Sequence, residues 1–196
     1  DISIKTSSWF GEKGVYFAVQ VEDSNVNYNK YKRITRNSGV ELMFADASKT
    51  VADGNAYRYS LAAGGQSKFY IFKGSAYVEH IVAVENRPWS KVTTQGGTIH
   101  SGNCTGYTAE VFIPVEIFGG EALPEAIALN IGLITSSSSD VTATDRDWIE
   151  ISSQISAGWR NPQTWYKFDK NGFVHQNITL TCGSGGTAEA EYDYIL

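Results

Sequence analysis

Apolar and polar residues alternate with a period of two along several stretches of this chain. The clearest stretches are residues 15–22, 40–44, 107–113 and 127–133. Successive side chains of a β-strand point to opposite faces of a sheet, so each stretch predicts a strand with one face toward a core. A chain that repeats this pattern folds by burying the apolar faces of its strands against each other.

Shorter runs rich in β-branched and aromatic residues predict further strands, separated by Gly, Asn, Asp and Ser. They are residues 57–62, 68–73, 77–85, 148–152, 164–169, 176–182 and 190–196. Helix-like signals are confined to residues 114–118, which precede a Gly-Gly pair, and to residues 152–157. The pattern predicts an all-β fold: an antiparallel two-sheet β-sandwich of the jelly-roll or immunoglobulin-like kind, with minimal helix.

The length of 196 residues is enough to bury a core without covalent staples, and we expect residues 1–196 to form a single domain. A glycine-rich joint at residues 183–186 precedes the last predicted strand. We therefore treat residues 174–196 as a C-terminal extension that can add a strand to the sandwich.

The charge of the chain argues against two classes of partner. The formal net charge is −5, and no basic run is longer than Lys30-Tyr31-Lys32-Arg33. Nucleic acid, whose phosphates need a basic surface, is therefore not expected as a partner. No apolar stretch approaches the roughly 20 residues of a membrane-spanning helix, so no membrane insertion is expected. No signal peptide is visible, and the chain reads as a mature or excised piece.

The two cysteines, Cys104 and Cys182, lie beside predicted strands in a setting rich in Gly, Ser and Thr. Such a setting is typical of secreted or cell-surface proteins, in which disulfides form. A disulfide between the two residues and a pair of free thiols both stay open, because two cysteines alone do not fix a pairing.

One acidic and one basic residue stand out on the polar sides of two predicted strands. Glu41 lies opposite the apolar side of residues 40–44, and Arg58 belongs to residues 57–62. If the two strands pair antiparallel, the two charges lie side by side on one sheet face. Such a pair can hold sugar hydroxyls through charge-assisted hydrogen bonds, or it can be a solvated ion pair worth about 0–1 kcal/mol.

The tryptophans are placed near the ends of predicted strands or in loops. They are Trp9, Trp89, Trp148, Trp159 and Trp165. An aromatic ring at such a place offers an apolar face to the C–H face of a sugar, while polar neighbours bind its hydroxyls. The alternative for each tryptophan is a role as an apolar plug at the end of the sandwich.

Several motifs occur in an order that resembles the family 9 carbohydrate-binding modules, within the DOMON-like β-sandwich group. The motifs are residues 14–23, 38–44 and 106–114, followed by residues 128–132, 159–162 and 165–168. The resemblance covers roughly residues 9–173. Each motif alone is weak, and the ordered set is specific for the fold.

The resemblance implies a non-catalytic β-sandwich that binds a glycan or oligosaccharide. Members of this family are commonly accessory modules of secreted or surface proteins that degrade polysaccharides, and some hold structural calcium. On the same basis, Trp159 would stack on the sugar, and Glu41, Arg58 and Arg146 would bind its hydroxyls.

Three features depart from the family pattern. Thr35 stands where a second stacking tryptophan is expected, Gly132 stands at a position used for hydroxyl contacts, and the usual opening segment is absent. Another aromatic residue can supply the second wall, the ligand can differ, or the site can be lost. The candidates for that wall are Tyr31, Trp89 and Trp9, and residues 192–196 can take the place of the missing first strand.

Acidic loops offer oxygen ligands for calcium, above all at Asp23, Asp46 and Asp53. Calcium takes six to eight oxygens, and each loop supplies only two or three side chains, so the alternative is that these residues cap turns. Structural Ca²⁺ is therefore expected only from the resemblance. No organic cofactor is expected. The histidines lack metal-ligand spacing, and Met43, which a haem would need beside one of them, lies on a strand where a packing role is favoured.

We expect no enzyme activity, because the sequence contains no Ser/His/Asp order, nucleophile elbow or phosphate-binding glycine loop. The expected partners are a glycan and the neighbouring domains of a larger protein, and the expected location is outside the cell. The alternative function is a structural or adhesive module of a bacterial surface protein with a degenerate sugar site. That alternative predicts an exposed apolar patch.

Overall fold

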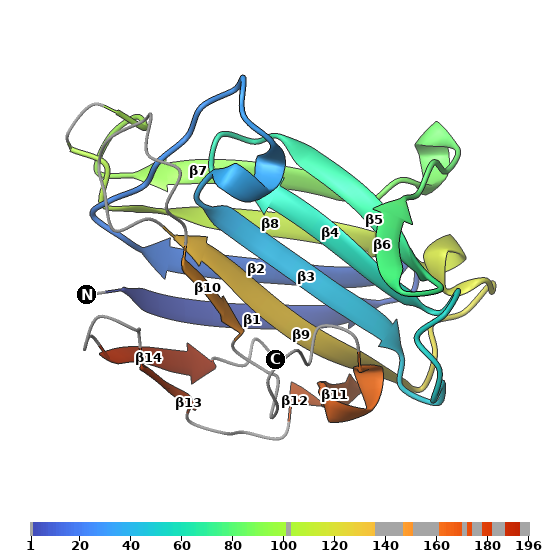
Figure 1. The fold of residues 1–196 in the computed structure, drawn as a ribbon. Helices are drawn as coiled ribbons and strands as arrows, with labels where there is room; N and C mark the ends of the chain where they lie inside the picture. Colours follow the sequence, from blue (N-terminus) through green and yellow to red (C-terminus); the bar gives the residue numbers. More distant parts are fainter. Residues whose placement is uncertain are drawn as a thin grey trace.

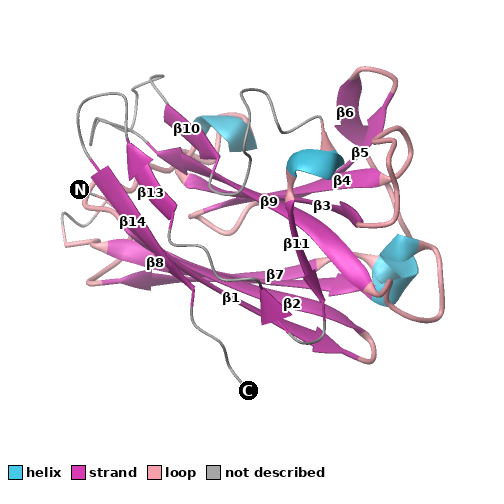
Figure 2. Cartoon of the chain, turned by 90° about the horizontal axis from the view of Figure 1, so that it is seen from below, coloured by secondary structure: helices cyan, strands magenta, loops and turns pink. Residues whose placement is uncertain are grey.

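A computed structural model describes residues 2–100, 103–135, 147–150, 161–169, 172–173, 178–181 and 187–192. These residues form two β-sheets that face each other, as Figure 1 and the view from below in Figure 2 show. The helical segments of the described part are single 3-10 turns, namely η1 (Ile34–Arg36), η2 (Val84–Asn86), η3 (Val115–Phe118) and η5 (Pro162–Thr164). The predicted all-β sandwich with minimal helix is confirmed. None of these described turns is long enough to cross a bilayer.

The first sheet is built around β2, which pairs antiparallel with β1 on one side and with β8 on the other. Its strand order is β13 (Ile178–Thr181), β14 (Thr187–Tyr192), β1 (Ser3–Gly11), β2 (Gly14–Glu22), β8 (Gly106–Pro114) and β7 (Trp89–Gln95). All pairs in this sheet are antiparallel except that between β14 and β1, which is parallel.

The second sheet is built around β3, which pairs antiparallel with β4 and with β9. Its strand order is β12 (Gly172–Phe173), β11 (Tyr166–Asp169), β9 (Ala126–Thr135), β3 (Gly39–Asp46), β4 (Ala56–Ala62), β5 (Ser67–Lys73) and β6 (Ala76–Glu79). The short strand β10 (Asp147–Glu150) pairs with residues 132–135 at the C-terminal end of β9, and β11 pairs with residues 126–129 at its N-terminal end.

The core lies between the sheets and consists of the residues that the alternation assigned to one face. It includes Val15, Phe17, Val19 and Val21 of β2, Val40, Leu42 and Phe44 of β3, Tyr107, Ala109, Val111 and Ile113 of β8, and Ile127, Leu129, Ile131 and Leu133 of β9. Because the register keeps these side chains opposite one another, their burial is the main stabilising contribution to the fold.

Besides the two-residue strand β12, the strands β1 and β7 are absent from the sequence prediction. Both contain many Ser, Thr and Lys residues, so the periodicity is weak even though Ile4 and Thr6 are buried. The predicted strand at residues 77–85 is too long. β6 ends at Glu79, the last ladder bond runs from the His80 N–H to the Phe69 carbonyl, and Ile81 is exposed.

The C-terminal extension contributes the antiparallel hairpin β13–β14 to the first sheet. β14 lies along β1, with Ile4 beside Ala190 and Thr6 beside Tyr192. The predicted last strand continued to residue 196, and residues 193–196 lie outside the described part, as do residues 152–157 with their predicted turn.

The second sheet is buried on its outer face as well as its inner face along β3. A second apolar cluster on that outer face contains Met43, Ala45 and Trp165, together with Ala56, Phe72 and Ala128. Trp165 is only 3% exposed. The part of this outer face around Ala45 and Trp165 is therefore covered, and only the remaining part can present polar groups to a ligand.

Cys104 is a free thiol whose Sγ donates to the carbonyl of Gly106 at 3.4 Å. Cys182, the other half of the disulfide considered from the sequence, lies outside the described residues.

Tyr107 carries a fully buried hydroxyl that has no hydrogen-bond partner in the part of the chain that the structure describes. Burial, and secondly the charge of Asp23, raise the pKa of this hydroxyl well above its usual value. Removing an unsatisfied buried hydroxyl removes a desolvation cost, so Tyr107→Phe should leave the free energy of unfolding unchanged or raise it by up to about 1 kcal/mol. Urea denaturation measures this change.

The matched control is Tyr59→Phe, because the Tyr59 hydroxyl shares a hydrogen bond of 2.8 Å with Ser90 Oγ. That variant should lose about 1 kcal/mol. A larger loss for Tyr107→Phe than for Tyr59→Phe would show that Tyr107 has a partner after all.

Candidate functional site

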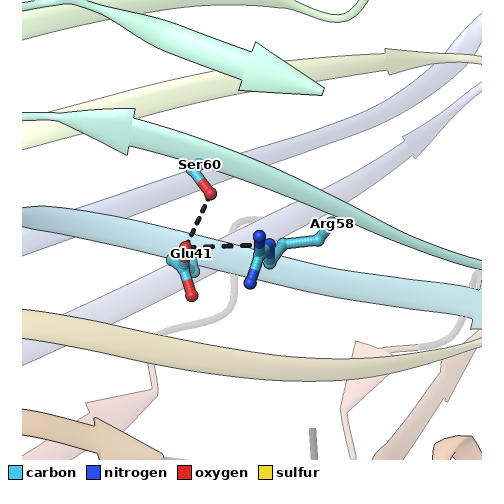
Figure 3. A network of polar contacts seen from close by, with 3 residues as sticks. All are labelled: Glu41, Arg58 and Ser60. Atoms are coloured by element: carbon cyan, nitrogen blue, oxygen red, sulfur yellow. Dashed lines mark hydrogen bonds and ion pairs between the residues drawn. The ribbon is translucent and has the colours of Figure 1, made fainter. Parts of the chain in front are cut away.

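The charged pair predicted from the sequence forms on the outer face of the second sheet. β3 and β4 pair antiparallel with Glu41 beside Ser60 and Met43 beside Arg58, so Glu41 and Arg58 are diagonal neighbours. Figure 3 shows Ser60 and Arg58 both directed at Glu41. The strands thereby place one anion and one cation on a single face, opposite the apolar side chains of the core.

Glu41 is held by two neighbours from β4. The Ser60 hydroxyl donates to Glu41 Oε1 at 2.6 Å, and Arg58 Nε lies 3.7 Å from the same oxygen. The Glu41 side chain is 4% exposed, whereas that of Arg58 is 18% exposed. The carboxylate therefore fixes the guanidinium, and the guanidinium is the group that a ligand can reach more easily.

Two tyrosine rings set the orientation of Arg58. Its guanidinium carbon lies 4.5 Å from the ring centre of Tyr70 and 4.8 Å from that of Tyr77. Cation–π contact of this kind restricts the plane of the guanidinium. Arg58 Nε is buried and has no hydrogen-bond acceptor among the described residues, so one donor stays unsatisfied within the structure.

Trp148 of β10 is a site residue that the sequence analysis named only among the five tryptophans near strand ends or loops. β10 places it beside Ile134, and a Cβ added to Gly132 would collide with its indole ring. Gly132 is paired with Glu41, so the indole lies about one strand spacing from Glu41, and 42% of Trp148 is exposed. The missing side chain at Gly132 is therefore the sequence signal, because it makes room for an aromatic ring.

A cavity of about 750 Å³ adjoins Arg58. It lies between β4–β5 and the segment that contains η1, and Thr35 and Tyr70 are part of its wall. Tyr31 belongs to the same segment and is 85% exposed, with the Lys30 ammonium 5.0 Å from its ring centre. Thr35 therefore lines the cavity beside Arg58, and its side chain makes that wall of the cavity polar.

Other predicted site residues are not brought to this face. Trp89 and Trp9 lie in the first sheet, where the register places Trp9, Tyr16, Phe112 and Trp89 in one row across four strands. Trp9 and Trp89 are 57% and 55% exposed. Trp159 and Arg146 lie outside the described residues.

The carboxylates proposed for calcium do not form a common site. Asp23 accepts from Thr135 Oγ1 and the Asn25 N–H, Asp46 accepts from Ser48, and Asp53 accepts from the Gly74 N–H. No group of three or more His, Cys, Asp or Glu residues suited to a metal occurs among the described residues. Each of the three carboxylates thus accepts hydrogen bonds from neighbouring residues, as turn-capping residues do, and structural Ca²⁺ stays a prediction from the resemblance.

Together, the described residues define a β-sandwich with a site on the outer face of one sheet. This site contains polar side chains with an exposed aromatic ring beside them. Neither the scan against family models nor the search of curated proteins gave a match. Solved structures do match. One is a carbohydrate binding module family 9 protein from Caldicellulosiruptor kristjanssonii in complex with glucose, with 12% identity, 90% of this chain and 80% of that chain covered, and a TM-score of 0.62.

A second match is a carbohydrate binding module family 9 protein from the same organism in complex with cellotriose. It has 13% identity, covers 87% of this chain and 78% of that chain, and has a TM-score of 0.57. At such low identity the likeness shows the fold. The resemblance that the ordered motifs predicted is thereby confirmed at the level of the fold.

Proposed function

We propose that this chain is a non-catalytic carbohydrate-binding module. The observation that carries the proposal is the outer face of the second sheet. Arg58, which forms an ion pair with Glu41, and the exposed indole of Trp148 both lie on this face. A planar guanidinium donor for hydroxyls and an aromatic face for C–H groups are the two contacts that a sugar ring uses.

The matched structures support this proposal, since their descriptions name bound glucose and cellotriose. Trp159 and Arg146 belong to the proposal through the resemblance alone. By the same resemblance, the module would be an accessory part of a secreted or cell-surface protein that degrades polysaccharides.

Isothermal titration calorimetry against a panel of mono-, oligo- and polysaccharides tests the proposal. Trp148→Ala should weaken the binding of the best ligand by about tenfold or more, since an aromatic ring that becomes buried under a ligand commonly contributes much of the binding energy. Trp159→Ala, measured in parallel, tests the residue that the resemblance assigns.

The matched control is Trp89→Ala, because Trp89 is similarly exposed but lies on the other sheet. Its affinity should equal that of the unchanged protein. Heat from no sugar, or equal affinities for Trp148→Ala and Trp89→Ala, would contradict the proposed site.

A structural or adhesive module is the second candidate function. The aromatic row of Trp9, Tyr16, Phe112 and Trp89 favours it, because exposed aromatic side chains at one register form an apolar strip. On this alternative no sugar binds, and Trp9→Ser/Trp89→Ser reduces association with the neighbouring domains of the parent protein.

A further inference from the structure

The cavity beside Arg58 has a strongly basic lining. Lys30, Lys32, Arg33, Arg58 and Lys68 line it, and no aspartate or glutamate does so among the described residues. The chain as a whole has 21 acidic and 16 basic residues, so this concentration of cations runs against its overall charge. The short basic run noted in the sequence thus becomes one wall of a cavity.

The segment that carries Lys30, Lys32 and Arg33 is fixed to the second sheet. Gln66 Nε2 donates to the Lys30 carbonyl at 3.2 Å, and the Asn29 N–H donates to Asn37 Oδ1 at 2.6 Å. The Tyr28 ring packs so closely on Gly64 that a Cβ there would collide with it. The basic groups therefore project from an ordered backbone, which lowers the entropy lost when a ligand binds.

The opposite side of the cavity is formed by β4 and β5. Lys68 Nζ lies 3.0 Å from Glu79 Oε2, and the hydrogen bond and charge of Glu79 raise the pKa of Lys68. Arg58 is similarly accompanied by Glu41 and keeps a buried Nε without an acceptor in the described part. Both cations line the cavity together with the basic segment.

We propose that this cavity binds an acidic glycan, one whose sugar rings carry carboxylate or sulfate groups. Lys30 and Arg33 bind the acidic substituent, and Arg58 binds the same sugar or its neighbour. This inference rests on the proposed function and specifies its ligand class.

Size and chemistry both favour a sugar over a small inorganic anion. The volume of about 750 Å³ lies in the range of sites for organic ligands, and it exceeds what a single sulfate or phosphate fills. Thr35, Ser67 and Gln66 add hydroxyl and amide groups that suit ring hydroxyls. Thr35 gives the cavity a polar wall where the resembling family has an indole. On this side of the cavity, charge therefore replaces aromatic stacking as the contact with the sugar.

Calorimetry with matched ligands tests the inference. The ligands are trigalacturonate, its carboxyl-reduced neutral form, cellotriose and a sulfated chondroitin tetrasaccharide. Trigalacturonate or the sulfated ligand should bind at least about tenfold more tightly than the neutral trisaccharides. Binding of trigalacturonate shows that carboxylates suffice, whereas binding of the chondroitin ligand alone, which carries both groups, shows that sulfates are needed. Raising NaCl from about 50 mM to about 500 mM should weaken only the acidic ligand, because screening acts on charge pairs.

The key variant is Lys30→Gln/Arg33→Gln, and its control is Lys13→Gln/Lys91→Gln, which removes the same charge from exposed positions of the first sheet's hairpin and edge. The first should weaken the acidic ligand by about tenfold or more and leave neutral sugars within about twofold. The control should change neither.

Each contrary result has a defined meaning. Neutral sugars that bind as tightly as acidic ones, or an acidic ligand unaffected by Lys30→Gln/Arg33→Gln, overturn this inference and leave the proposed function standing. Equal binding of a short single-stranded DNA of the same charge, or displacement by equimolar inorganic sulfate, also overturns it, because the cavity would then be a general anion site. Binding of no saccharide at all overturns the proposed function and this inference together.

Discussion

Phe44→Ala should lower the free energy of unfolding by about 3–5 kcal/mol, the usual cost of removing a buried phenylalanine ring. Phe44 of β3 is completely buried. Its ring centre lies 5.6 Å from that of Tyr57, 5.7 Å from that of Phe118 and 6.3 Å from that of Phe69, so the substitution empties the middle of an aromatic cluster. Urea denaturation followed by tryptophan fluorescence measures the loss.

The control for Phe44→Ala is Phe112→Ala. Phe112 has the same side chain but lies half-buried on the outer face of the first sheet, in contact with Tyr16. Its truncation should cost less than half as much, because solvent can fill the space. Similar losses for the two variants would mean that the core does not lie between the sheets as described.

Arg58→Ala should destabilise the fold by about 3 kcal/mol and abolish glycan binding. The substitution leaves the Glu41 carboxylate buried with the Ser60 hydroxyl as a hydrogen-bond donor but without its cation, and an uncompensated buried charge is costly. Equilibrium denaturation gives the stability, and calorimetry on the folded variant gives the binding.

Two further variants separate the charge effect from lost packing. Glu41→Gln/Arg58→Ala should be more stable than Arg58→Ala alone, because the buried charge is then removed. Lys68→Ala, which breaks the exposed pair with Glu79, should leave stability unchanged within error. If the double variant is no more stable than Arg58→Ala, the interaction between Glu41 and Arg58 does not stabilise the fold.

The core could be predicted from the sequence because its signal is local. Val40, Leu42 and Phe44 alternate with Glu41 and Met43, and the pleat alone decides that these two sets face opposite sides. The same argument placed Glu41 on the outer face. A separate signal, the Gly-Gly pair that follows, predicted the turn at residues 114–118, and the structure has it at Val115–Phe118 with Gly119 in the left-handed conformation. Strands such as β1 and β7, whose inward residues are partly polar, carry too little contrast for this argument.

The neighbours of Glu41 could be predicted only in part. The sequence analysis assumed that β3 and β4 pair antiparallel, and the two-residue offset that puts Ser60 instead of Arg58 directly beside Glu41 depends on the loop between the strands. Trp148 and the basic cavity depend on contacts between segments that are far apart in the chain. The basic run at residues 30–33 stays largely exposed, and only the fold brings it to the same cavity as Arg58 and Lys68.

By itself, the sequence determined which residues of the strongly alternating strands face the core, that the fold is a β-sandwich, and that Glu41 points away from the core, because strand periodicity is a local property of the chain. The tertiary structure alone decided that Trp148 lies over Gly132, that Trp89 lies on the other sheet, and that Lys30 and Lys68 line the same cavity. Those placements follow from sheet order and loop packing, and residue spacing along the chain does not encode them.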